Sequence, residues 1–183
     1  MGTLIGDDGN DAQARFEAIA MPHLDAAYNL ARWLTRNEHD AEDLVQSAYL
    51  RAFRFASSFR GGDARAWLLT IVRNTHYTSL RDGRAERSAV SFDEELHTDA
   101  AGQSGDNDPA CIVGRRNAAL TVNEALEQLP TAFREILVMK ELDDLTYKQI
   151  AQVADIPIGT VMSRLARARK MLLDCLQHGA AGD

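Results

Sequence analysis

Residues Leu145–Leu172 read LTYKQIAQVADIPIGTVMSRLARARKML, and this segment decides the fold of the second half of the chain. Thr146 followed three residues later by Gln149 predicts a capping box, which fixes the start of a helix. Pro157 interrupts the apolar periodicity and predicts a turn just before it, because proline lacks an amide hydrogen and disfavours helix at the preceding residue. Two short helices around a tight turn predict a DNA-reading helix-turn-helix.

The second of these helices has one apolar stripe and a cationic outward face. At about 3.6 residues per turn, the stripe predicted to be buried consists of Val161, Leu165, Ala168 and Leu172. The residues predicted to face outward are Thr160, Ser163, Ala166, Arg167 and Lys170, with Arg164 and Arg169 on the flanks. The flanking arginines can reach phosphates or be held by local carboxylates, and the small Ala166 allows close approach to a thymine methyl. The alternative is a basic amphipathic helix in an ordinary helical bundle.

Length and composition favour a soluble cytoplasmic protein of one domain or two small ones. The chain has 183 residues, of which 45% are hydrophobic. It contains no run of about 18 apolar residues and no signal-peptide pattern, so we expect no membrane insertion. Cys111 and Cys175 lie far apart and outside any metal-binding spacing, so we expect neither a disulfide nor a metal, and no cofactor.

The charge is negative overall but unevenly distributed. The net charge is -7, and residues 1–47 carry nine acids against three bases. Residues 60–87 carry six bases against three acids, whereas residues 88–111 carry six acids and no Lys or Arg. Because acidic segments repel the phosphate backbone, we expect weak DNA binding by the protein alone and a need for a partner.

The N-terminal half is predicted to be helical. Pro22 separates a helix at Arg15–Ala20 from one at Leu24–Leu34. Asp40 is predicted to cap a third helix that runs to about Phe55, with acids in its first turn, where the helix dipole favours them. The apolar stripe predicted for the second helix consists of Leu24, Ala27, Tyr28, Ala31 and Leu34.

A fourth helix is predicted from about Asp63 to Arg81, after a loop that contains Gly61 and Gly62. Its basic, amide and aromatic groups suit a nucleic-acid surface. Those groups include Arg65, Arg73, Asn74 and Tyr77. An alternative of equal weight makes Trp67 and Tyr77 core aromatics and the arginines a solvated face.

The predicted fold class is all-α, with two small helical domains joined by a flexible acidic linker. Residues 1–83 form the first domain, 84–107 the linker, 108–178 the helix-turn-helix domain and 179–183 a tail. In the second domain we expect a helix at Ala110–Leu129, ended by Pro130, and another at Ala132–Leu142.

Three sequence blocks together resemble the extracytoplasmic-function group of bacterial alternative RNA polymerase sigma factors. They are DAEDLVQSAYLRAFR at Asp40–Arg54, FRGGDARAWLLTIVRNTHYTSLR at Phe59–Arg81, and LPTAFREILVMKELDDLTYKQIAQVADIPIGTVMSRLARARKML at Leu129–Leu172. The resemblance extends from about Phe16 to Leu176. It implies a sigma factor that directs core RNA polymerase to a class of promoters and is held inactive by an anti-sigma factor.

The resemblance also assigns roles to particular residues. It implies that Asp43 and Gln46 bind the beta-prime clamp helices of core polymerase, whose beta subunit is a further partner, while Ser47 stands where relatives often carry Glu. Promoter DNA would be read at the -10 element by Arg65, Arg73, Asn74 and Tyr77. The -35 element would be read by Thr160, Ser163, Arg164, Ala166, Arg167 and Lys170. Met162 replaces a common Lys or Arg, and Asp155 replaces a common turn Gly that Asp can imitate in left-handed backbone.

Three other classes of function compete with a sigma factor. The leading one is a helix-turn-helix regulator that is not a polymerase subunit, which would need a receiver or ligand-binding domain upstream; no repeated strand pattern indicates one. A helical protein-interaction module is the next. An enzyme is the least favoured, because the sequence has no phosphate-binding glycine loop, no metal-ligand spacing and no nucleophile motif.

Overall fold

The structure is a computed structural model that describes residues 7–90 and 122–179. Both described parts are helical and contain no strand, which confirms the all-α class. The chain divides into two compact units: residues up to 80 together with 152–155, and the remainder. We name them after the helices at 7–90 and 122–179 that make up most of each, the N-terminal unit and the C-terminal unit. In the described parts, no helix combines the length and hydropathy that a membrane span requires.

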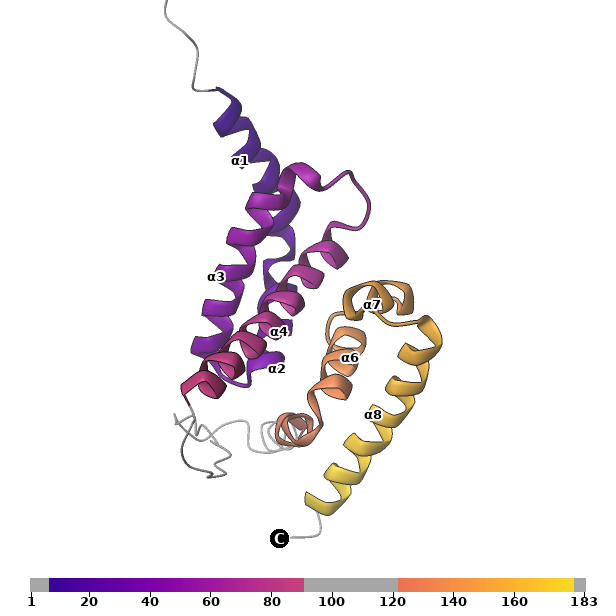
Figure 1. Ribbon diagram of the computed structural model, residues 1–183. Coiled ribbons are helices and arrows are strands. Elements are labelled where there is room, and N and C mark those ends of the chain that lie inside the picture. Colours follow the sequence, from indigo (N-terminus) through magenta and orange to yellow (C-terminus); the bar gives the residue numbers. More distant parts are fainter. Residues whose placement is uncertain (1–6, 91–121, 180–183) are drawn as a thin grey trace, which may run out of the picture. The chain divides into compact units, whose positions relative to one another are not determined.

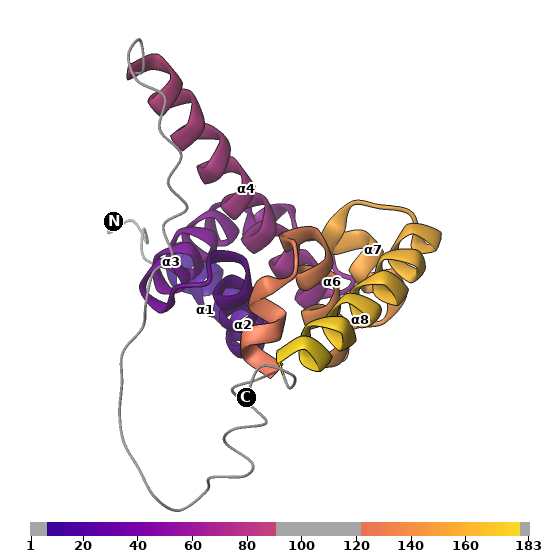
Figure 2. The ribbon, with the colours of Figure 1, turned by 90° about the horizontal axis from the view of Figure 1, so that it is seen from below.

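The N-terminal unit is built on α2 and α3, which lie side by side (Figures 1 and 2). The elements are α1 (Asp7–Ala20), the 3-10 turn η1 (Met21–His23), α2 (Leu24–Thr35), α3 (Glu38–Phe55), η2 (Ala56–Ser58) and α4 (Ala64–Val90). Small side chains let α2 and α3 approach closely. The buried alanines are Ala26, Ala27 and Ala31 on α2 and Ala41, Ala48 and Ala52 on α3.

The start of α3 differs from the sequence prediction. Asn37, not Asp40, is the N-cap, because its Oδ1 accepts a hydrogen bond from the backbone amide of Asp40 at 3.1 Å. Arg36 ends α2 in left-handed backbone, with φ 61°, so the chain turns at once and the next helix begins at Glu38. Asp40 lies in the first turn, where the helix dipole still stabilises its negative charge.

The helix α4 begins as predicted but extends further. Asp63 caps it by accepting a hydrogen bond from the amide of Ala66 at 2.9 Å. It continues to Val90 instead of ending near Arg81, so its last turns occupy residues that were predicted to be linker. Polar composition alone does not stop a helix, and a single glycine such as Gly83 only weakens one. The rest of that linker and the predicted helix start at Ala110 lie outside the described residues.

The C-terminal unit contains residues 122–128, which are helical, followed by α6 (Thr131–Glu141), α7 (Tyr147–Ala154) and α8 (Ile158–Gly179). Helices α6 and α8 pack side by side (Figures 1 and 2). Arg134 is buried and donates hydrogen bonds to the carbonyls of Glu127 at 3.0 Å and Leu129 at 2.9 Å. It thereby satisfies the carbonyls left free where the helix at 122–128 ends.

Candidate nucleic-acid interface

Helix α7 has well-defined caps at both ends. Thr146 and Gln149 form the predicted capping box: the amide of Thr146 donates to Oε1 of Gln149 at 2.7 Å, and the amide of Gln149 donates to Oγ1 of Thr146 at 3.3 Å. Asp155 ends α7 with φ 53°, in the left-handed region that the sequence prediction required. These caps fix both ends of α7, and the chain turns at Asp155 before α8 begins at Ile158.

The outward face of α8 is exposed as predicted. Val161, Leu165 and Ala168 are buried, whereas Leu172, predicted in the same stripe, is only half-buried because it lies toward the end of the helix. The predicted DNA-facing residues are all at least partly accessible. Ser163, Ala166, Arg167 and Lys170 are exposed, and Thr160 and Arg164 are half-buried.

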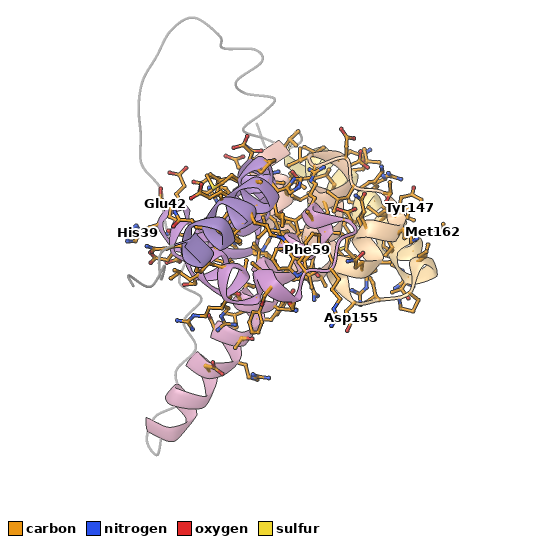
Figure 3. All side chains as sticks on the ribbon, turned by 90° about the horizontal axis from the view of Figure 1, so that it is seen from above. His39, Glu42, Phe59, Tyr147, Asp155 and Met162 are labelled. Carbon is orange, nitrogen blue, oxygen red and sulfur yellow. The ribbon has the colours of Figure 1, made fainter. Side chains whose placement is uncertain are left out.

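Arg169, predicted on the flank of this face, is held by a carboxylate. Its Nε and Nη2 donate to Oε1 of Glu141 on α6, at 3.1 and 2.6 Å. This hydrogen bond is the main reason that the pKa of Arg169 is raised above its usual value, and Tyr147 adds a smaller contribution. Figure 3 shows Tyr147 and Met162 at the surface of the C-terminal unit.

On α4 the structure brings together three of the four predicted -10 residues. The guanidinium of Arg73 lies over the ring of Tyr77, 4.6 Å from its centroid, and Asn74 beside them is exposed. Arg65 is nine residues before Asn74, which is two and a half turns, so it lies on the opposite side of the helix. It approaches His23 instead, whose pKa is lowered first by burial and then by the charge of Arg65.

The loop before α4 is held by an aromatic pair. The rings of Phe59 and Trp67 lie 5.0 Å apart, so Trp67 anchors this loop, in line with the alternative that makes it a packing residue. Gly61 and Gly62 have φ of 94° and 104°, conformations that other residues rarely adopt.

The exposed side of α3 borders a groove shared with α2. Asp43 and Gln46, the predicted polymerase-binding residues, are both exposed and line a hollow of about 500 Å³. Leu24 and Tyr28 were predicted to be core residues, but they are exposed and line the same groove. Their position at the edge of the α2 stripe was the sequence signal that could have placed them at the surface. The other lining residues are Glu42, Val45 and Tyr49.

Asp43 also lines a second hollow, of about 350 Å³. Asp40, Ser47 and His76 contribute polar atoms to its wall. Asp43 therefore borders two depressions of the N-terminal unit, while Ser47 lies in the second and not in the groove beside Gln46. In the part of the chain that the structure describes, no group of His, Cys, Asp and Glu side chains is arranged to hold a metal ion.

Known proteins match both units. Residues 19–86 match the family described as sigma-70 region 2, and residues 119–172 match sigma-70 region 4. The ECF RNA polymerase sigma factor SigE of Mycolicibacterium smegmatis is 31% identical over 178 residues, covering 96% of this chain and 67% of that protein. The ECF RNA polymerase sigma-E factor of Escherichia coli K12 is 34% identical over 137 residues, covering 73% of this chain and 72% of that protein.

Solved structures agree with these matches. The sigma factor RpoE of Bartonella quintana, crystallised with the anti-sigma factor NepR, is 29% identical, with a TM-score of 0.67 over 88% of this chain and 96% of that one. CnrH, solved with the cytosolic domain of CnrY, shares the fold at 23% identity, with a TM-score of 0.61 over 91% of this chain and 90% of that one.

Proposed function

Because this chain belongs to the ECF family of RNA polymerase sigma factors, we propose that its two units divide polymerase binding and promoter reading between them. Sigma factors are transcription initiation factors and not enzymes, so the chemistry belongs to the polymerase that this chain recruits. The observation that carries the proposal is the contrast between two exposed faces. One is acidic and grooved on α3, and the other is cationic on α8.

The cationic face of α8 is the proposed reader of the -35 element. Arg167 and Lys170 are exposed, and no acid occurs from Ile158 to Leu173, so the face complements the phosphates of duplex DNA. In a helix-turn-helix the second helix lies in the major groove, with its N-terminal residues at the base edges. Thr160 and Ser163 are in that N-terminal part, and Arg164 flanks them.

The exposed side of α4 is the proposed reader of the -10 element. Asn74 offers an amide that can hydrogen-bond to the edge of an unstacked base. Arg73 and Tyr77 beside it supply a phosphate-binding cation and an aromatic ring, and their mutual contact holds both in place. Arg65 contributes from the opposite side of the helix, close to His23, and we assign it a weaker role.

The groove between α2 and α3 is the proposed docking site for the beta-prime clamp helices of core polymerase. Asp43 and Gln46 are polar groups at its rim, and Leu24 and Tyr28 give it an apolar wall. An apolar centre with a polar rim is the usual anatomy of a protein interface. The same exposed faces are those that an anti-sigma factor would cover to hold the chain inactive in the cytoplasm, and the beta subunit is a further polymerase partner.

The test separates the two activities with single substitutions in the full chain. Asp43→Ala is expected to weaken the complex with core polymerase on gel filtration, by roughly tenfold if one buried polar contact is lost, with promoter choice unchanged. Glu124→Ala removes a comparable exposed acid from the C-terminal unit and serves as the control.

Arg167→Ala is expected to leave the polymerase complex intact and to reduce transcription from promoters that depend on the -35 element. Arg15→Ala, which removes an exposed cation from α1, is the matched control. If the wild-type chain forms no complex with core polymerase and creates no new initiation sites on a genomic promoter library, the proposal fails. Equal loss of both activities in each variant would contradict the division of roles.

A further inference from the structure

One side of α8 exposes apolar side chains next to the cationic face. Ile158 and Met162 are 44% and 51% exposed, although both are large and apolar. Ala166, also exposed, follows Met162 by four residues, as Met162 follows Ile158. Since residues four apart are neighbours on a helix surface, the three form a continuous apolar strip over the first turns of α8. Figure 3 shows Met162 at the surface of the C-terminal unit.

The surroundings of the strip favour DNA over a protein as its occupant. Lys170 borders it, Arg167 lies further round on the cationic face, and the helix carries no acid before Asp174. Arg169, the cation on the strip's own flank, is engaged by Glu141 on α6 at 3.1 and 2.6 Å. Because Arg169 is held by Glu141, the groups that this side of α8 offers to a base edge are the apolar side chains of the strip. The cations that attract phosphates lie on the neighbouring face.

We propose that Met162 reads the C5-methyl group of a thymine in the upstream promoter element. This inference rests on the proposed reading of the -35 element by α8. The thymine methyl is the apolar group that base pairs present in the major groove, so an apolar side chain at a base edge selects for it. Met162 lies in the second turn of α8, where recognition helices contact bases, and its unbranched side chain adapts to the methyl group. Ala166 leaves room for the base pair beside it.

The first experiment uses holoenzyme assembled from the full chain and core RNA polymerase, with a promoter library randomised over the upstream element. Wild-type protein is expected to enrich thymine on one strand at one position. Met162→Ala is expected to lose that preference and to keep the preferences at other positions. Leu173→Ala is the control, because Leu173 is 57% exposed on the same side but lies about three turns further along α8.

The second experiment changes the DNA instead of the protein. The enriched promoter is synthesised with deoxyuridine at the selected position, which removes only the methyl group. Wild-type holoenzyme is expected to bind the deoxyuridine promoter about threefold to fivefold more weakly, the effect of one buried methyl group. Met162→Ala holoenzyme is expected to bind both promoters within about twofold. Because the key comparison uses wild-type protein, it does not depend on how the variant folds.

The outcomes separate the inference from the function on which it rests. Equal wild-type affinity for thymine and deoxyuridine promoters, or an unchanged sequence preference in Met162→Ala, overturns the reading of the methyl group while the -35 function stands. A Met162→Ala variant that keeps its promoter preference and loses affinity for a purified protein partner assigns the strip to that partner and also overturns the inference. Failure of the wild-type holoenzyme to enrich any upstream sequence overturns both.

Discussion

Arg169 on α8 donates hydrogen bonds from Nε and Nη2 to a single oxygen, Oε1 of Glu141 at the end of α6. The two residues are 28 positions apart, so the pair ties the proposed recognition helix to the helix that supports it. The side chains of Arg169 and Glu141 are 49% and 48% exposed, and water therefore screens much of their attraction. The contact between Arg169 and Glu141 therefore contributes more to the orientation of α8 against α6 than to the free energy of unfolding.

Glu141→Gln is accordingly expected to lower the free energy of unfolding of the C-terminal unit by no more than about 1 kcal/mol. Urea unfolding followed by far-ultraviolet circular dichroism measures this change. Trp33 and Trp67 are the two tryptophans and both lie in the N-terminal unit, so their fluorescence transition should stay unchanged. Combining Glu141→Gln with Arg169→Gln should cost less than the sum of the single changes, and strict additivity would show that the pair has no coupling.

His23 is expected to report the position of Arg65. Burial and, after it, the Arg65 charge lower the pKa of His23, while Asp63 raises it. Arg65→Gln should therefore raise the pKa of His23 toward about 6.5, and Asp63→Asn should lower it further. An NMR titration of the imidazole measures both shifts. Arg73→Gln is the control and should have little effect, and an unchanged pKa in Arg65→Gln would contradict the contact.

The direction of that shift also predicts a pH dependence of stability. A lowered pKa in the folded state means that folding favours the neutral imidazole of His23. The contribution of His23 to the free energy of unfolding is complete above its unfolded-state pKa of about 6.5. It is lost as the pH falls through the lower pKa that His23 has in the folded state. In the Arg65→Gln variant, the stability that His23 loses on acidification should be smaller than in the wild type.

Tyr49 is expected to titrate late. Its hydroxyl donates to the carbonyl of Ala20 at 3.0 Å, and burial, with a smaller effect of Asp25, raises its pKa to about 12. Because the folded pKa exceeds the ordinary value of about 10, the stability from the neutral phenol is complete below pH 10 and is lost as the pH rises toward 12. Absorbance titration of the phenolates measures this, and Tyr49→Phe should remove a component near pH 12. A profile unchanged by that substitution would contradict the assignment.

Local chemistry explains which features could be predicted from the sequence. The capping box of Thr146 and Gln149 and the buried residues Val161 and Leu165 depend on spacings within one or two turns, so the sequence alone indicates them. Asn37 and Asp40 both have side chains that can cap a helix. Arg36 ends α2 in left-handed backbone, so the chain turns there and Asn37 becomes the N-cap of α3.

Other features depend on what packs against a helix. Leu24 and Tyr28 belong to the apolar stripe of α2 by periodicity, but they are exposed and line the groove beside Asp43 instead. The contact between Glu141 and Arg169 is set by the packing of α6 on α8 and has no local signal. The separation of Arg65 from Asn74 was available from their nine-residue spacing, since it corresponds to two and a half turns.

Asp155 tests whether the turn sets the orientation of α8. The amide of Ile156 donates to the carbonyl of Ala151 at 3.1 Å and that of Asp155 to the carbonyl of Gln152 at 3.4 Å, which is the Schellman pattern with Asp155 where glycine is usual. Its φ of 53° is tolerated by Asp, Asn and Gly but costs a β-branched residue about 1–2 kcal/mol.

Asp155→Gly and Asp155→Asn should therefore retain wild-type stability to within about 1 kcal/mol, whereas Asp155→Val should lose about 1–2 kcal/mol. If the strained turn also tilts α8, Asp155→Val should reduce transcription from promoters that depend on the -35 element and leave polymerase binding unchanged. Urea unfolding and in vitro transcription with the same protein preparations measure the two effects. Valine and glycine variants that are equally stable would mean that the left-handed conformation does not constrain this turn.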